Sequence, residues 1–263
     1  MDSNITAKVI LDALPAYGSR LTTVEVTMPK FLVAQLNTHR ALVKNSASSR
    51  AIPVTSTIKG ILEHPVTPAN HEMPANSSGM IPRRSLKGVR KLLAKVLWNT
   101  GMYFNIGLAY LQSKVGLHKA WVNRPLEAYM TTKVLITATE WDNFFTLRIH
   151  PDAQDAMQEV ALKISKAIGT HVPTPVSPGY WYLPYVGALL EPTQADLDIS
   201  VSCCAQVSYR TLDMSPDKAK RVVSKLLGDT PHWSPFEHIA VLDYNPKGSY
   251  KSWSTYRHIL DNQ

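Results

Sequence analysis

The 263-residue sequence contains only two cysteines, Cys203 and Cys204, and no long hydrophobic run. Adjacent cysteines in an apolar stretch make neither a disulfide framework nor a CxxC metal or redox pair, so we expect two small buried side chains. No segment approaches the ~20 apolar residues of a membrane-spanning helix. The polar start, MDSNITAK, lacks the basic and apolar regions of a secretory signal. We therefore expect a cytoplasmic protein with no membrane segment.

Acidic residues are also scarce, since 20 Asp and Glu stand against 28 Lys and Arg, and the formal net charge is +8. This excess favours anionic partners such as phosphates or nucleic acid, without choosing between them. The 44% hydrophobic and 18% charged content is typical of a compact globular chain. We expect a single domain over residues 1–263.

The common enzyme signatures are missing. The sequence has no GxxxxGK[ST], GxGxxG, HExxH or GxSxG motif, which removes the usual signals of P-loop enzymes, dinucleotide-binding domains, zinc proteases and α/β-hydrolases. Any activity must therefore be sought in less familiar residue patterns.

Hydrophobic periodicity and turn residues predict the order of the elements. Strands and helices intermix without a regular βαβ repeat, which indicates an α+β domain with a mostly antiparallel sheet flanked by helices. The predictions are a strand over 21–28, helices over 30–44 and 86–115, a helix within 150–168 with Pro151 and Asp152 in its first turn, a strand over 199–209, a helix over 215–227, a strand over 239–244 and a short terminal helix. The proline-rich segment 64–84 is expected to be a loop or lid.

Three polar clusters lie at breaks between the predicted elements. Arginines beside serine hydroxyls are suited to binding phosphate. Each cluster also has an ordinary explanation, for example Ser234 as a helix N-cap with Glu237 completing a capping box. The clusters are His39, Arg40, Asn45, Ser48 and Arg50; Asn143, Arg148, His150, Asp152 and Gln154; and His232, Ser234, Glu237 and His238.

These clusters resemble the motifs of flavin-dependent thymidylate synthases. His39-Arg40, followed after seven residues by Ser48 and then Arg50, resembles the family's arginine-histidine-arginine and serine signature. The segments HWSPFEHI, NFFTLRIHPDAQ and AQVSY resemble three further blocks of the family. The blocks stand in a different order from that of the ordinary family, so the chain resembles a circularly permuted member. It also resembles phage-encoded relatives that share this order.

The resemblance implies an activity and a set of roles. The family joins C5 of dUMP to the one-carbon unit of methylenetetrahydrofolate and reduces the adduct with hydride from FAD, which NADPH recharges. Family sites form between subunits, so a homotetramer is expected, with no requirement for nucleic acid or membrane. It is expected in the cytoplasm, which is that of the host if the protein is phage-encoded. The implied roles are catalysis for Arg148 and Ser48; substrate binding for Gln35, Ser48, Arg50, Arg124 and Arg148; and cofactor binding for His39, Arg40, Asn45, Asn143, His232, Ser234 and Glu237.

Two departures from the family pattern leave the substrate open. Thr38 stands where the signature has its first arginine, and Ser46 stands where an acidic residue is usual. The alternatives are a dCMP methylase, or a hydroxymethylase of dUMP or dCMP for phage DNA modification. A different class, a non-catalytic nucleic-acid-binding protein using the basic helix 87–95, predicts no bound flavin and steep salt dependence.

A weak internal repeat involves the C-terminus. Pro29-Lys30 precedes Thr38-His39-Arg40 at the same spacing as Pro246-Lys247 precedes Thr255-Tyr256-Arg257. Arg257 then matches Arg40. It is expected either to supply positive charge near the site or to be an ordinary solvated residue of a terminal helix.

Overall fold

The computed structural model describes residues 4–68, 73–78, 84–208, 212–243 and 245–262. A five-stranded sheet forms its centre, in the order β3-β4-β2-β1-β5, and all neighbours are antiparallel except the parallel pair β1 and β5. The strands are β1 (Thr6–Pro15), β2 (Leu21–Pro29), β3 (Val43–Ser46), β4 (Thr131–Ala138) and β5 (Thr174–Val176).

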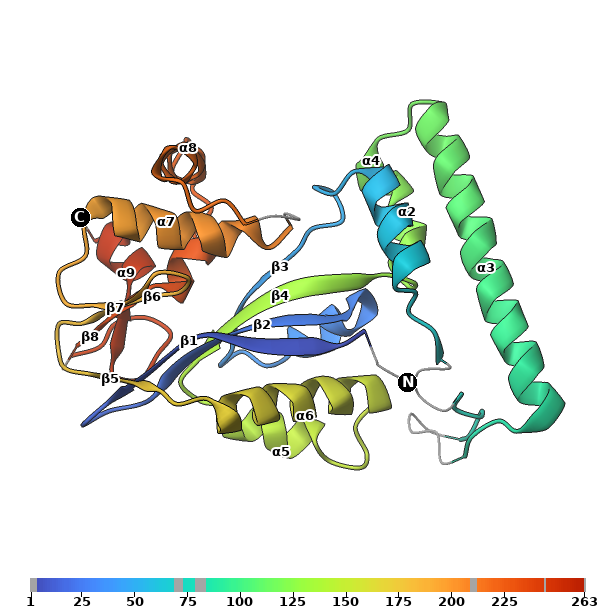
Figure 1. Cartoon of the computed structure of the whole chain (residues 1–263), viewed down its shortest axis with the longest axis horizontal. Coiled ribbons are helices and arrows are strands. Elements are labelled where there is room, and N and C mark those ends of the chain that lie inside the picture. The colour runs from blue at the N-terminus through green and yellow to red at the C-terminus, as the bar shows by residue number, and fades with distance from the viewer. Residues whose placement is uncertain (1–3, 69–72, 79–83, 209–211, 244, 263) are drawn as a thin grey trace.

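Helices α5 (Asp142–Arg148) and α6 (Asp155–Thr170) cover one face of this sheet (Figure 1). Successive side chains of a strand point to opposite faces. Val134 and Ile136 of β4 therefore join the core under α6, while Leu135 joins a second core on the other face. Since both faces are covered, Val134, Leu135 and Ile136 follow one another as three apolar residues in the middle of β4 instead of alternating with polar ones.

A second, antiparallel sheet lies beside the first. Its order is β7-β6-β8-β9, and Trp253 and Tyr182 are fully buried between the two sheets together with Leu21 of β2. The elements are β6 (Trp181–Leu183), β7 (Gly187–Leu189), β8 (Ala240–Leu242), β9 (Trp253–Thr255), α7 (Gln194–Ala205), α8 (Pro216–Leu226), α9 (Tyr256–Asp261), and the 3-10 turns η4 (Gln206–Ser208) and η5 (Ser234–His238). The α+β class is confirmed, with two sheets where one was predicted.

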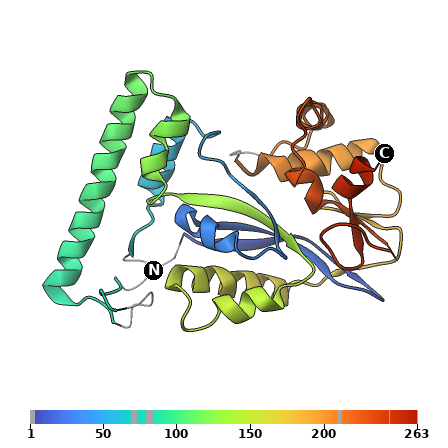
Figure 2. The same cartoon turned by 180° about the vertical axis from the view of Figure 1, so that it is seen from behind.

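The opposite end of the molecule is helical. Helix α2 (Val54–Glu63), the long α3 (Gly88–Lys114), α4 (Lys119–Val122) and the 3-10 turn η3 (Arg124–Leu126) share a small core of their own. Figure 2 shows α3 standing at the edge of the molecule, with α2 and α4 on one side only. The predicted helices 86–115 and 215–227, the last strand and the terminal helix are confirmed.

The predicted helix over 30–44 is wrong. The segment is a 3-10 turn η1 (Lys30–Leu32), one short helix α1 (Val33–Leu36), a turn that contains His39 and Arg40, and then β3. Thr38 donates its hydroxyl hydrogen to the Gln35 carbonyl at 2.7 Å and so helps to end the helix. Beyond the turn, Val43 pairs with Thr137 of β4. This tertiary pairing outweighs the helical spacing of the apolar residues.

The predicted strand over 199–209 is also wrong. Residues 194–205 form α7, and a capping box between Thr193 and Asp196 begins it. Cys203 and Cys204 are buried in this helix, so their burial is confirmed but not their strand. Short apolar runs of small and β-branched residues do not distinguish a buried helix from a buried strand.

Two smaller predictions also change, and a third falls partly outside the described residues. Helix α6 begins at Asp155, so Pro151 and Asp152 belong to the preceding turn. Trp233 is the N-cap residue of η5 and no side chain caps it, so the capping box of Ser234 and Glu237 is not formed. Of the predicted loop 64–84, residues 69–72 and 79–83 lie outside the described residues; the rest includes the buried Val66 and Met73.

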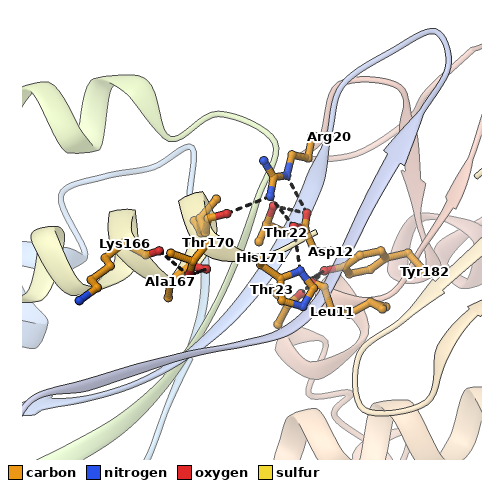
Figure 3. Close-up of polar contacts among 11 residues, drawn as sticks. Leu11, Asp12, Arg20, Thr22, Thr23, Lys166, Ala167, Thr170, His171 and Tyr182 are labelled. Atoms are coloured by element: carbon orange, nitrogen blue, oxygen red, sulfur yellow. Dashed lines mark hydrogen bonds and ion pairs between the residues drawn. The ribbon is translucent and has the colours of Figure 1, made fainter. Parts of the chain in front are cut away.

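A buried ion pair ties the β1–β2 hairpin to the end of α6 (Figure 3). The fully buried Asp12 carboxylate accepts hydrogen bonds from Arg20 and from the Thr22 hydroxyl at 2.9 Å. Arg20 also donates to the carbonyl of Ile168 at 3.1 Å, and His171 Nδ1 lies 3.3 Å from the same carboxylate. The carboxylate thus has the partners that a buried charge requires.

Candidate functional site

A pocket of about 700 Å³ opens between α3 on one side and α1, the end of α5 and the start of α6 on the other. This volume lies in the range of small-molecule sites. It is lined by Phe31 and Gln35; Val66, Thr67, Pro68 and Pro74; Trp98 of α3; and Arg148, Asp152, Ala153, Gln154, Asp155 and Ala156. Two of the predicted substrate residues, Gln35 and Arg148, therefore meet at one cavity.

Arg148 reaches the pocket from the end of α5 and is held by two neighbours. Its Nε donates to His39 Nε2 at 2.8 Å, and its Nη2 donates to the Thr38 hydroxyl at 3.3 Å. Thr38, which replaces the signature arginine, thus still contacts the site. Both contacts come from the turn after α1, so the turn that breaks the predicted helix is the one that orients the guanidinium.

His39 must be neutral with its proton on Nδ1 to accept this bond, because arginine only donates. Burial, with added repulsion from Arg148 and Lys44, lowers the pKa of His39. The ring is buried and packs edge-on against Phe144, with the ring centres 5.0 Å apart. His39 is therefore a fixed acceptor that leaves the charge of Arg148 unreduced.

The other walls of the pocket are mixed. Gln35 donates to the Gln154 side chain at 2.5 Å, which joins α1 to the loop before α6. Trp98 forms the apolar wall; its indole donates to the Val66 carbonyl at 3.1 Å and its ring packs edge-on with Tyr129. Sequence reasoning missed Trp98 and Phe31. Nothing in the local sequence marks them, since the pocket wall exists only once α3 has packed against the loop at residue 66.

A second group gathers at the far end of β3. Ser49 donates to Glu127 Oε1 at 2.6 Å, and Arg124 donates to the same oxygen at 3.2 Å. The half-buried Lys30 ammonium donates to the carbonyl of Ala47 at 2.8 Å, and desolvation lowers the pKa of Lys30. The predicted residues Ser48, half-buried, and Arg50, exposed, flank Ser49.

Asn123 holds the backbone of this turn. Its fully buried side-chain amide donates to the carbonyls of Ser49 and Ile52 at 2.7 and 2.9 Å. The predicted phosphate residues Arg50 and Arg124 therefore lie on neighbouring segments, beside the unpredicted Lys30, but neither lines the pocket.

A third group surrounds η5, which β3 contacts. Asn45 of β3 donates to the Cys204 carbonyl at 2.7 Å. Glu237 forms an ion pair with Arg257, and its backbone carbonyl accepts from the Tyr250 hydroxyl at 2.7 Å. β3 and η5, which lie far apart in the sequence, are thus neighbours in the fold. Arg257 is neither free nor directed at the pocket: it also pairs with Asp261.

The predicted flavin residues do not enclose a site within one chain. None of the seven lines the pocket. Arg40, Asn143, His232 and Ser234 are exposed on the surface, and Asn45 and Glu237 already have partners within the chain. A second surface would have to cover these residues before they could hold a cofactor.

The described residues contain no group of three or more His, Cys, Asp or Glu side chains placed to hold a metal ion. Likewise, no helix in the described part of the chain is long and apolar enough to cross a membrane.

Comparison with known proteins identifies the fold. No known family profile and no curated protein sequence matches the chain. Two crystal structures of the UMP/dUMP methylase PolB from Streptomyces cacaoi do match. The one bound with 5-Br dUMP has a TM-score of 0.52 and 14% identity, over 64% of this chain and 91% of that chain. The one bound with 5-Br UMP has a TM-score of 0.51 and 17% identity, over 64% and 90%. The chain therefore has a fold that a pyrimidine nucleotide methylase uses.

Proposed function

We propose that this protein is a flavin-dependent methylase that converts dUMP to dTMP. Methylenetetrahydrofolate supplies the carbon, reduced FAD supplies the hydride, and NADPH recharges the flavin. The observation that carries the proposal is Arg148, held by the neutral His39 at a pocket of nucleotide size in a nucleotide methylase fold. The sequence motifs of the flavin-dependent family support the same reading.

Arg148 has the main chemical task in this proposal. The pyrimidine C5 is a poor nucleophile in the neutral ring and becomes an effective one when the ring carries negative charge, which is shared with the ring carbonyl oxygens. A guanidinium fixed beside those carbonyls stabilises that charge in the transition state. His39 and Thr38 hold Nε and Nη2, so the group is oriented before the substrate arrives.

The cysteines do not compete for a nucleophilic role. Burial raises the pKa of Cys203 to about 11 and raises that of Cys204 as well. Both are therefore thiols at neutral pH, and only a thiolate attacks effectively. This agrees with a reaction that needs no protein nucleophile.

The remaining roles follow the groups of residues. Ser48, Arg50 and Arg124, with Lys30 beside them, are proposed to bind the nucleotide phosphate, because cations and hydroxyls gather there. His39, Arg40, Asn45, Asn143, His232, Ser234 and Glu237 are proposed to contact FAD. Because four of these seven residues are exposed on the surface of one chain, the proposal includes a homotetramer whose sites lie between subunits.

The test is a spectrum followed by an assay. The purified protein should be yellow or take up FAD, and should convert dUMP to dTMP with methylenetetrahydrofolate and NADPH, with the product identified by mass. A preparation that stays colourless with added FAD and leaves dUMP unchanged would contradict the proposal. A colourless protein that instead binds nucleic acid, with affinity falling steeply as salt rises, would assign it to the non-catalytic class.

A second candidate shares the chemistry but changes the base or the product. Thr38 accepts from Arg148 where the family signature has an arginine, so the cationic surroundings of the base differ. A dCMP methylase, or a hydroxymethylase in which water ends the reaction, follows from that change. Parallel incubations with dUMP and dCMP, with a mass difference of one oxygen between methyl and hydroxymethyl products, decide among them.

A further inference from the structure

The outward side of α3 is an apolar surface along most of the helix. Leu93, Leu97, Phe104, Leu108, Leu111 and Val115, which we call the α3 seam, are each 40% to 83% exposed. Folded chains that act alone seldom expose so extended a patch. At 1.5 Å per residue, the 27 residues of α3 span about 40 Å.

The seam is not the side that α3 uses inside the chain. Met102 and Ala109 are the buried side chains of the helix, and they pack with α2, α4 and η3. Trp98 also points inward, to the pocket. Figures 1 and 2 both show α3 at the edge of the molecule, with nothing on its outer side.

Four of the other five seam residues are spaced symmetrically about Phe104, and the fifth, Leu108, has Thr100 at its mirrored position. Leu97 and Leu111 lie seven residues before and after Phe104, and Leu93 and Val115 lie eleven before and after it. Intervals of seven keep side chains on one face of a helix. If a second copy of α3 packs antiparallel with Phe104 on the two-fold axis, Leu97 meets Leu111 and Leu93 meets Val115. Self-complementary contact of this kind is what a two-fold interface requires.

Charge selects the antiparallel arrangement. Helix α3 contains no Asp or Glu, and Lys91 and Lys95 lie on the side of the helix away from the seam. Lys114, the basic residue of the last turn, lies over the ring of Tyr110, which is not part of the seam. Arg90 flanks the seam in the first turn, where the positive end of the helix dipole disfavours a cation. Antiparallel pairing places Arg90 beside the negative C-terminal end of the partner helix, whereas parallel pairing would place it beside another Arg90.

We propose that α3 pairs antiparallel with α3 of a second copy of this chain, through the seam centred on Phe104. The pairing does not depend on the reaction proposed above, and it names a face that the expected homotetramer leaves unspecified. Trp98 projects from the inward side of the same helix and lines the pocket. A helix held in place by the pairing therefore also holds this wall of the pocket in place.

Cysteine cross-linking of the full chain tests both the contact and its direction. Under mild oxidation, Phe104→Cys should form a cross-linked dimer by itself. Leu97→Cys and Leu111→Cys should each stay uncross-linked alone and cross-link when the two proteins are mixed and allowed to exchange. The control is Val172→Cys, which is more exposed than these three residues but lies off α3. Self-cross-linking of Leu97→Cys and Leu111→Cys would mean parallel pairing and would overturn the proposal.

Light scattering with the double variant Leu97→Glu, Leu111→Glu supplies an independent measurement. The variant should have half the mass of the wild-type assembly and an unchanged circular dichroism spectrum, because both residues are on the surface; Val172→Glu should keep the full mass. A wild-type protein that is monomeric would overturn the proposal. If that monomer floats with vesicles of anionic lipid, the seam belongs to a membrane surface instead. Since neither measurement uses substrate or flavin, failure here is separate from failure of the proposed reaction.

Discussion

At the scale of single residues, Arg148 offers the sharpest test of the chemistry. Its Nε is bound to a neutral histidine, so the guanidinium keeps its full charge at the pocket. We expect Arg148→Ala to lower kcat by about 100-fold or more, the ~2.7 kcal/mol typical of one charge-stabilising contact. Flavin content should stay nearly unchanged, since Arg148 is assigned to the substrate.

Two comparisons give that experiment its meaning. Arg50→Ala should mainly raise KM for the nucleotide, because Arg50 is assigned to phosphate and not to the reacting ring. Arg221→Ala, on the exposed face of α8, should change neither constant. Near-normal turnover of Arg148→Ala would reject the assignment.

His238 makes a prediction about acid stability. It is fully buried, bonded to the Thr137 hydroxyl at 2.7 Å, and burial lowers its pKa to about 3. The unfolded chain takes up a proton below about pH 6.5 that the folded chain does not, so stability falls as the pH drops through that range. Between pH 7 and pH 5, His238 should remove about 2 kcal/mol of unfolding free energy.

Urea unfolding at the two pH values measures this loss. In His238→Asn the loss between pH 7 and pH 5 should be about 2 kcal/mol smaller than in the wild type, whatever the stability of the variant at pH 7. The exposed His64→Asn should retain the wild-type pH dependence. Equal pH dependence in His238→Asn and wild type would show that this ring is not kept neutral by the fold.

Sequence reasoning reached some site residues and not others for identifiable reasons. Arg148 and Gln35 were found by motif resemblance, and both line the pocket. Trp98 and Lys30 were missed because their surroundings come from segments distant in sequence: the Val66 carbonyl for one and the Ala47 carbonyl for the other. A single sequence carries no sign of such contacts.

At the scale of elements, the success at α6 and the error at α7 have a common cause. Helix α6 was predicted because Met157, Val160 and Ile164 repeat at helical spacing on one buried face. Helix α7 was not, because six of its residues, polar serines included, are buried, and its apolar residues show no preferred side. Periodicity identifies an element that is buried on one face; it fails where the whole circumference is covered.

The hairpin of β1 and β2 contains the ion pair of Asp12 and Arg20, and Arg20 also donates a hydrogen bond to the end of α6. Removing Arg20 leaves the fully buried Asp12 carboxylate without its main counter-charge. We expect Arg20→Met to cost about 3 kcal/mol, the lower end for a buried pair, because Arg20 itself is one-third exposed. Denaturant unfolding measures the cost.

The double variant Arg20→Met, Asp12→Asn separates charge from packing. It removes the uncompensated charge, so it should recover part of the stability lost in Arg20→Met. Lys59→Met serves as the control, since Lys59 pairs with Glu63 on the surface, and should cost less than about 1 kcal/mol. If Arg20→Met cost no more than Lys59→Met, the hairpin would be held by its apolar contacts alone.

At the scale of the whole molecule, the C-terminal helix packs against two elements that come much earlier or separately in the chain. Helix α9 places Tyr256 against the rings of Trp181 and Phe236, with ring centres 5.7 and 5.9 Å apart, while Arg257 pairs with Glu237 on the same turn. The contacts join β6, η5 and the terminus, which lie far apart in sequence. The apolar and ionic contacts of α9 can be tested separately.

We expect the apolar part to dominate. Tyr256→Ala should cost about 3 kcal/mol or more, as truncation of a buried aromatic side chain does. Arg257→Ala should cost less than about 1 kcal/mol, because its side chain is 41% exposed and solvent screens such a pair.

If Arg257 merely fixes Glu237, its loss should leave turnover unchanged. If it supplies the charge suggested by the repeat with Arg40, turnover should fall although stability hardly changes, so steady-state kinetics of a variant that still unfolds normally decides between the two roles.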